Sequence, residues 1–268
     1  NMWTSVNDYK QFANTFYSWT RDFSSVVYDG THSDKRSDLI TYQSYNEFSR
    51  GINSIPSSDA NYTDNYKHIR RTNLLIENAE TYSKPEDIKQ YLGEAYFFRA
   101  YSYFDLLQLY GDVIITKKPL DITDPEMKVK RNDRSEVVDL IIDDLNHAVE
   151  NLPAFKELTT EEEGRISKEG AQAFLSRVAL YEGTWQKSRN GNQNTQRSAN
   201  LLDIAAKAAR TVIDAKYGYT FRLFGTDSET KILGDSAQKY MFILENEKSN
   251  PAGIKKSSNH EYTFARRH

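Results

Sequence analysis

The segment QYLGEAYFFRAYSYFDLLQLYGDVIIT, residues 90–116, sets the architecture of this chain. Its apolar and aromatic residues recur every three or four positions, which predicts one long helix that ends at Gly111. One face carries Leu92, Tyr96, Tyr103 and Leu107, and that face is broadened by Phe97, Ala100, Phe104 and Leu106. A helix that is apolar around most of its girth is buried, so we expect this one to lie between neighbouring helices.

Two charged residues, Glu94 and Arg99, lie inside this apolar helix. They are five residues apart, so they point to different faces. A buried charge without a partner is costly, and each of them therefore needs a partner on another element. We interpret both as structural rather than catalytic.

Apolar stripes at the same spacing predict five further helices, at residues 5–29, 64–82, 133–152, 167–185 and 198–215. The segment between the first two, residues 30–62, is less regular and rich in Ser, Asp, Asn and Tyr, with a short helical pattern near its middle. After Tyr217 the pattern weakens into short apolar patches and loop. The sequence therefore predicts an all-α fold of antiparallel helix pairs, with at least five helices, long irregular loops and little or no sheet.

Capping residues and tryptophans add detail to these helices. Ser83 stands three residues before Glu86, which is capping-box spacing for the central helix, and Asp133 has the same relation to Glu136. Trp19 and Trp185 fall on apolar stripes, so we expect both to be buried in the core and to take no part in ligand binding. Asn73 also falls on an apolar face, where it must find a hydrogen-bond partner.

The composition excludes several classes of function. The net charge of −3 gives no electrostatic case for nucleic acid, and the absence of cysteine excludes disulfides, thiol catalysis and Cys-ligated metal. No run of 18 apolar residues occurs, so no transmembrane segment is predicted. The five histidines lack metal-ligand spacing, and no nucleophile or phosphate-loop motif is present. We therefore expect a binding protein that is not an enzyme and uses no cofactor.

Three stretches in order resemble the SusD/RagB family of outer-membrane nutrient-binding lipoproteins. Gly93 to Val113 matches the pattern G-E-A-x-F-x-R-A-x-x-Y-F-D-L-x-x-x-Y-G-D-V. Residues 66–73, YKHIRRTN, resemble the family's Y-x-x-I-R-x-x-N helix. Residues 164–180, which begin GRISK, resemble its G-R-I-T-K-x-A-A helix. Three matches spread over about a hundred residues are far more specific than one short motif.

This resemblance implies helix pairs stacked like divergent tetratricopeptide (TPR) repeats, with residues 1–268 forming one N-terminal domain of a longer protein. It implies a position on the outer membrane, anchored by a lipidated Cys that follows a signal peptide, neither of which is in this chain. The implied function is to bind oligo- or polysaccharide and to deliver it to a SusC-like TonB-dependent transporter. Two alternatives stay open, namely peptide uptake, as the RagB branch suggests, and a helical-repeat scaffold for protein partners.

Sugar rings stack on aromatic side chains while their hydroxyl groups bond to amides and charged groups. The leading aromatics outside the predicted core stripes are Trp3, Tyr28, Tyr42 and Tyr62. In some family members a Trp at the position of Tyr62 contributes to the glycan platform, so we expect Tyr62 and Asn65 in the site, with Tyr42 as a weaker candidate. The alternative is that Tyr62 only packs over the start of its helix.

Overall fold

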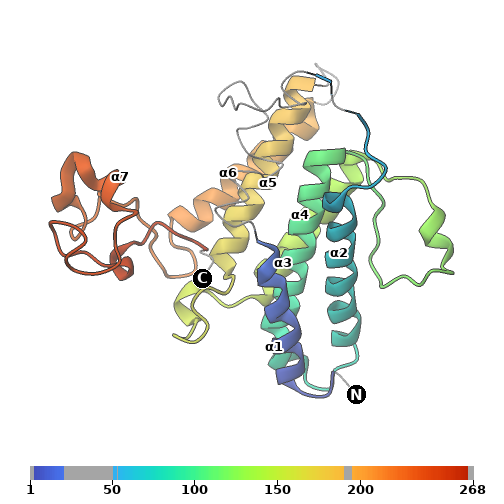
Figure 1. The fold of residues 1–268 in the computed structure, drawn as a ribbon, viewed down its shortest axis with the longest axis horizontal. Helices are drawn as coiled ribbons and strands as arrows, with labels where there is room; N and C mark the ends of the chain where they lie inside the picture. Colours follow the sequence, from blue (N-terminus) through green and yellow to red (C-terminus); the bar gives the residue numbers. More distant parts are fainter. Residues whose placement is uncertain (1–2, 21–50, 53, 190–194, 265–268) are drawn as a thin grey trace.

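The computed structural model describes residues 3–20, 51–52, 54–189 and 195–264 (Figure 1). Across these ranges there are seven α-helices and no β-strand, and the only ladder contact is an isolated bridge between Val113 and Asn132. The predicted all-α class is confirmed. The helices are α1 (Val6–Asn14), α2 (Ala60–Ala79), α3 (Pro85–Tyr110), α4 (Arg134–Asn151), α5 (Lys168–Arg189), α6 (Thr195–Ile213) and the short α7 (Ala237–Tyr240).

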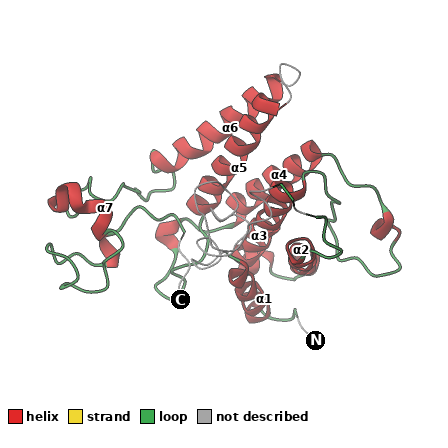
Figure 2. Cartoon of the chain, turned by 45° about the horizontal axis from the view of Figure 1, so that its top comes forward, coloured by secondary structure: helices red, strands yellow, loops and turns green. Residues whose placement is uncertain are grey.

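The long helix α3 is the centre of the main core. It packs against α1, α2 and α4, while α5 packs against α4 and α6, so that the helices stack in succession (Figures 1 and 2). Phe98, Tyr103 and Leu106 on α3 are fully buried. The helix ends as predicted: Gly111 has a φ of 73°, and its N–H donates to the Leu107 carbonyl at 3.1 Å.

The predicted start of α3 is wrong by one residue. Its N-cap is Lys84, whose side chain makes no capping hydrogen bond, rather than Ser83. Pro85 is the first helical residue, a position that suits its fixed φ and its missing N–H. The residue before the proline is therefore the N-cap, and Ser83 lies outside the helix.

The first helix is shorter than the predicted range of 5–29. The α-helix ends at Asn14, a 3-10 turn covers Thr15–Trp19, and Thr20 is extended; residues 21–29 lie outside the described ranges. The hydroxyl groups of Thr15, Ser18 and Thr20 each donate to the carbonyl three residues earlier, at 2.7–2.8 Å. Such local bonds compete with the α-helical pattern, which explains the early end.

The expectation that both tryptophans are buried is wrong. Trp19 and Trp185 are each half-buried. Trp19 stacks on His68 with ring centroids 4.1 Å apart, and Trp185 lies under the guanidinium of Arg134 at 4.3 Å. Both rings are therefore only partly covered by their neighbours. Their replacement by Ala should cost less than the 3–5 kcal/mol typical of a fully buried ring.

The imidazole of His68 makes the stability of this edge depend on pH. Burial lowers the pKa of His68 to about 4, below its ordinary value of 6.5. As the pH falls, His68 therefore takes up a proton in the unfolded chain at a higher pH than in the folded protein. Its contribution to the free energy of unfolding is retained above about pH 6.5 and declines from there towards pH 4. We expect His68→Gln to lose less stability than the wild type between pH 7 and pH 4.5 in urea unfolding. An NMR titration that gave His68 a pKa of 6 or above would contradict this.

Each of the two charges inside α3 has a partner on another element, as the sequence predicts. Arg99 forms a two-pronged ion pair with Asp144 of α4, at 2.6 and 2.8 Å, and its third nitrogen donates to the Asn73 side chain at 2.8 Å. Glu94 accepts two bonds of 2.7 Å from one nitrogen of Arg165. Glu94, Asn73 and Asp144 are fully buried. These residues tie α2, α3 and α4 together, and join α3 to the loop before α5.

A second, smaller apolar cluster follows α6. It consists of Phe224, Leu233, Leu244 and Ile254, and Figure 1 shows this segment reaching away from the helix stack. The helix α6 ends at Ile213, so Ala215, the last residue of the predicted range 198–215, lies outside the helix with a φ of 52°. The assignment of residues 1–268 to a single domain stays a prediction.

Candidate ligand-binding surface

Three tyrosine rings gather where α2 begins and α3 ends. Tyr62 and Tyr66 lie one turn apart on α2 with ring centroids 4.8 Å apart, and Tyr110 of α3 meets Tyr62 edge-on at 5.2 Å. All three rings are half-buried. We call Tyr62, Tyr66 and Tyr110 the tyrosine cluster; it presents aromatic surface beside polar side chains.

Helix capping brings these rings together. The Asp59 side chain accepts from the Asn61 N–H at 2.9 Å and so begins α2, while Gly111 ends α3 immediately after Tyr110. Since α2 and α3 pack together in opposite directions, the start of one lies beside the end of the other. The Tyr110 hydroxyl donates to the second oxygen of Asp59 at 2.6 Å, which joins the two ends directly.

Two hydroxyl groups of the cluster, those of Tyr66 and Tyr110, are held as protonated donors. The Tyr66 hydroxyl donates to the Ile114 carbonyl at 2.8 Å. Burial raises the pKa of Tyr66, and burial together with the bond to Asp59 raises the pKa of Tyr110. Neither phenol therefore ionises near neutral pH, and the cluster offers neutral rings and hydrogen bonds rather than an anionic group.

Asn65 lies next to the cluster but points into the protein. It is only 7% exposed, and its amide nitrogen donates to Asp105 of α3 at 2.9 Å and to the Asn61 carbonyl at 2.8 Å. These bonds link α2 to α3 and support the position of Tyr62. Ligand contact by Tyr62 and by Asn65 stays a prediction, and the geometry favours Tyr62, whose ring is half-exposed.

The other aromatics singled out in the sequence are Tyr28, Tyr42 and Trp3. Tyr42 and Tyr28 lie outside the described residues. Trp3 packs on Tyr9 and Phe12, with ring centroids at 5.0 and 4.7 Å. Sequence reasoning missed Tyr110 and Asp59, although both could have been found by placing the predicted start of one helix beside the predicted end of the next.

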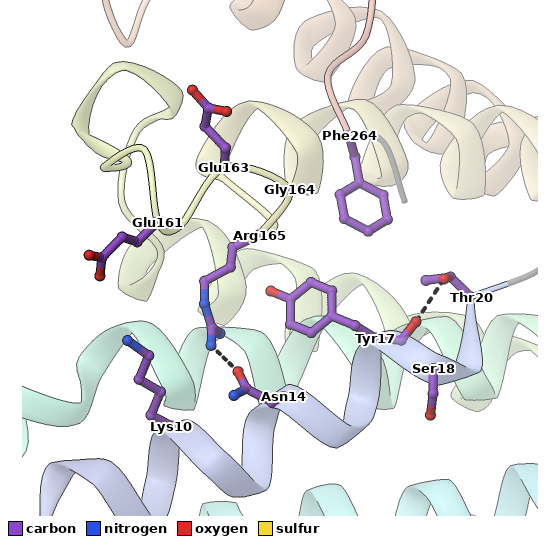
Figure 3. A pocket seen from close by; sticks show the side chains of 10 residues that line it. All are labelled: Lys10, Asn14, Tyr17, Ser18, Thr20, Glu161, Glu163, Gly164, Arg165 and Phe264. Atoms are coloured by element: carbon purple, nitrogen blue, oxygen red, sulfur yellow. Dashed lines mark hydrogen bonds between the residues drawn. The ribbon is translucent and has the colours of Figure 1, made fainter. Parts of the chain in front are cut away.

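A hollow of about 420 Å³ lies elsewhere, between α1 with its 3-10 turn and the loop before α5 (Figure 3). Lys10, Asn14 and Ser18 line one side of it, and Glu161 and Phe264 approach from the other. These two sides are about 150 to 250 positions apart in sequence, so no local pattern predicts the hollow.

Arg165 forms the inner wall of this hollow, and its guanidinium is already bound. It holds Glu94 at 2.7 Å and also donates to the Asn14 side chain. Burial raises the pKa of Glu94 while Arg165 opposes that rise. These bonds of Arg165 join α1, α3 and the loop before α5, and we assign them a structural role.

Two properties of the described part of the chain bear on function. No group of three or more His, Cys, Asp or Glu residues there is arranged to hold a metal ion. None of the helices described combines the length and hydropathy needed to cross a bilayer.

Comparison with known proteins identifies relatives for most of the chain. Residues 4–180 match a SusD-like family model described as starch-binding associating with outer membrane. A SusD-like protein of Formosa agariphila is 35% identical over 133 residues, which is 48% of this chain and 25% of that protein.

Solved structures share the fold. A SusD-like protein from Bacteroides fragilis superposes with a TM-score of 0.68 at 23% identity, over 98% of this chain and 45% of its own. A laminarin-binding SusD-like protein superposes with a TM-score of 0.52 at 26% identity, over 71% of this chain and 39% of its own. This chain therefore matches less than half of each relative.

Proposed function

Because this chain belongs to the SusD-like family, we propose that it takes part in binding oligo- or polysaccharide at the bacterial surface, without enzymatic activity. In this proposal the protein is attached to the outer membrane by a lipid anchor and passes its ligand to a partner TonB-dependent transporter. The family description supports the association with the outer membrane and the class of ligand. The laminarin-binding relative supports a β-glucan as one ligand to test.

The observation that carries the glycan proposal is the tyrosine cluster beside acidic and amide groups. Pyranose rings have apolar C–H faces that pack on aromatic rings, and their hydroxyl groups bond to carboxylates and phenols. Tyr62 offers a half-buried ring, and the ring of Tyr110 meets it edge-on at 5.2 Å. The Tyr110 hydroxyl and the Asp59 carboxylate, 2.6 Å apart, offer polar atoms beside these rings. The capped helix ends hold these groups in place, so a ligand would order few side chains on binding.

Tyr62→Ala tests this assignment in the full-length native protein. We expect its affinity for laminarin or starch to fall about fivefold to tenfold, because a ring contact is worth about 1 kcal/mol. The melting temperature should fall by only about 2–4 °C, since Tyr62 is half-buried. Isothermal titration calorimetry and thermal unfolding by circular dichroism measure the two quantities.

Tyr262→Ala is the matched control, because Tyr262 is 45% exposed and lies far along the chain from the cluster. This change should leave the affinity for laminarin and the affinity for starch unchanged. If Tyr62→Ala and Tyr262→Ala bound a recognised polysaccharide equally well, Tyr62 would be a packing residue. Binding of peptide mixtures in place of any polysaccharide would favour the uptake of peptides.

A further inference from the structure

A groove lies between α4 and α6 and is lined by residues of both helices. Both helices pack against α5, which lies between them (Figure 2). Their N-terminal ends are joined, because Arg197 of α6 bonds to Asp139 of α4 at 2.8 Å and to the Ser135 carbonyl at 3.0 Å. The groove holds a hollow of about 640 Å³, and Asp139 and Arg197 are among the residues that line it.

One face of each helix lines the groove. On α4 the lining residues include Ile142, Asp143 and Asn146, and on α6 they include Asn200 and Ile204. Spacings of three and four residues place each set on a single helical face. Two isoleucine side chains therefore lie between rows of exposed polar side chains, which is an arrangement that suits a chain lying along the groove.

The chemistry of the lining favours polypeptide over sugar. Among the described residues, none that lines this groove is aromatic, so this part of the lining gives a pyranose ring no surface on which to stack. Side-chain amides are instead prominent, at Asn146, Gln196 and Asn200. An amide carries both a donor and an acceptor, as a peptide group does, and can therefore pair with the backbone of an extended chain.

Two further features define the occupant. The Asp143 side chain is 61% exposed, and the imidazole of His147 lies 3.8 Å from its carboxylate. With Asp139 and Asp143 against Arg197, the lining has a net negative charge. A helix satisfies its own backbone groups, whereas an extended chain leaves them free to meet the amides.

We propose that the groove between α4 and α6 binds an extended polypeptide segment with a Lys or Arg side chain for Asp143 and aliphatic side chains for the isoleucines. Helical-repeat stacks present concave surfaces suited to such ligands. This site is separate from the tyrosine cluster, which lies on α2 and α3, and does not depend on the glycan proposal.

The test uses the full chain and fluorescein-labelled nonapeptides with blocked ends, built from Leu and Ser with two Lys residues. We expect saturable anisotropy changes with the Lys peptide and at least fivefold weaker binding of the same peptide with Glu in place of Lys. Asp143→Asn should weaken binding of the Lys peptide about threefold to tenfold, and Asn200→Ala about fivefold, the effect of one lost hydrogen bond. Both side chains are exposed, so circular dichroism should show unchanged folding.

Glu150→Gln is the matched control on α4. Its carboxylate is 71% exposed but does not line the groove, so binding should stay unchanged. Three results would overturn the proposal: no binding of the Lys peptide at millimolar concentration, equal binding by Asp143→Asn and the wild type, or NMR shifts of the Asn146 and Asn200 side-chain amides caused by laminarin instead of peptide. A glycan titration at the tyrosine cluster is unaffected by any peptide result, so the two proposals fail independently.

Discussion

Asp144→Ala is expected to destabilise the protein by about 3–5 kcal/mol, the cost of leaving a buried charge without its partner. Asp144 is fully buried, and both of its carboxylate oxygens bond to Arg99, which is itself 4% exposed. Removal of the carboxylate leaves the guanidinium with one side-chain acceptor, the amide oxygen of Asn73. Urea unfolding followed by circular dichroism at 222 nm measures the free-energy difference.

The adjacent residue provides the control for this prediction. Asp143 carries the same carboxylate on the same helix but is 61% exposed, so Asp143→Ala should change the free energy of unfolding by about 0.5 kcal/mol or less. The paired change of Arg99→Met and Asp144→Leu should recover much of the loss, because it removes both charges together. A loss below 1 kcal/mol for Asp144→Ala would show that water reaches Arg99.

Phe98→Ala is expected to cost a similar amount, about 3–5 kcal/mol, through the cavity that it leaves. Phe98 is fully buried on α3, and its ring contacts Tyr17, Phe16 and Trp19 with centroids 5.0, 5.8 and 6.0 Å away. The loss therefore loosens the contact between α3 and the segment that contains α1 and its 3-10 turn. Differential scanning calorimetry should show a lower melting temperature.

Phe242→Ala is the comparison for this cavity. Phe242 lies beside the smaller cluster near α7 and is 68% exposed, so its removal should cost about 0.5 kcal/mol or less. If Phe98→Ala cost no more than Phe242→Ala, the rings of the first segment would be able to refill the space, and the main core would be less tightly packed than the structure shows.

The central helix and its charges could be predicted from local pattern alone. A long apolar run with Gly111 at its end requires a buried helix, and a buried Arg99 or Glu94 requires a partner somewhere. The sequence could not say that the partners are Asp144 and Arg165, because each pair joins elements 45 or 71 positions apart. Periodicity also overestimated the burial of Trp19, since it reports the face of a helix and not how far its neighbour extends.

The candidate site also combines features that the sequence predicts with features that only the structure shows. Tyr62 falls outside the core stripes of the sequence, and in the structure its ring is half-buried and packs against the main core. Asn65 was chosen for its amide, but the structure shows that amide bonded to Asp105. Tyr110 and Asp59 join the cluster because two helices pack in opposite directions, so that the end of one lies beside the start of the other.

By itself, the sequence determined the all-α class, the order of the main helices with the approximate extent of all but the first, and the family, because helical periodicity, capping residues and motifs are all local properties of the chain. The tertiary structure alone decided which helices are neighbours, which carboxylate meets which arginine, and where the tyrosine cluster and the groove between α4 and α6 lie. These features depend on contacts between residues far apart in the chain, and such contacts form only when apolar faces are buried together.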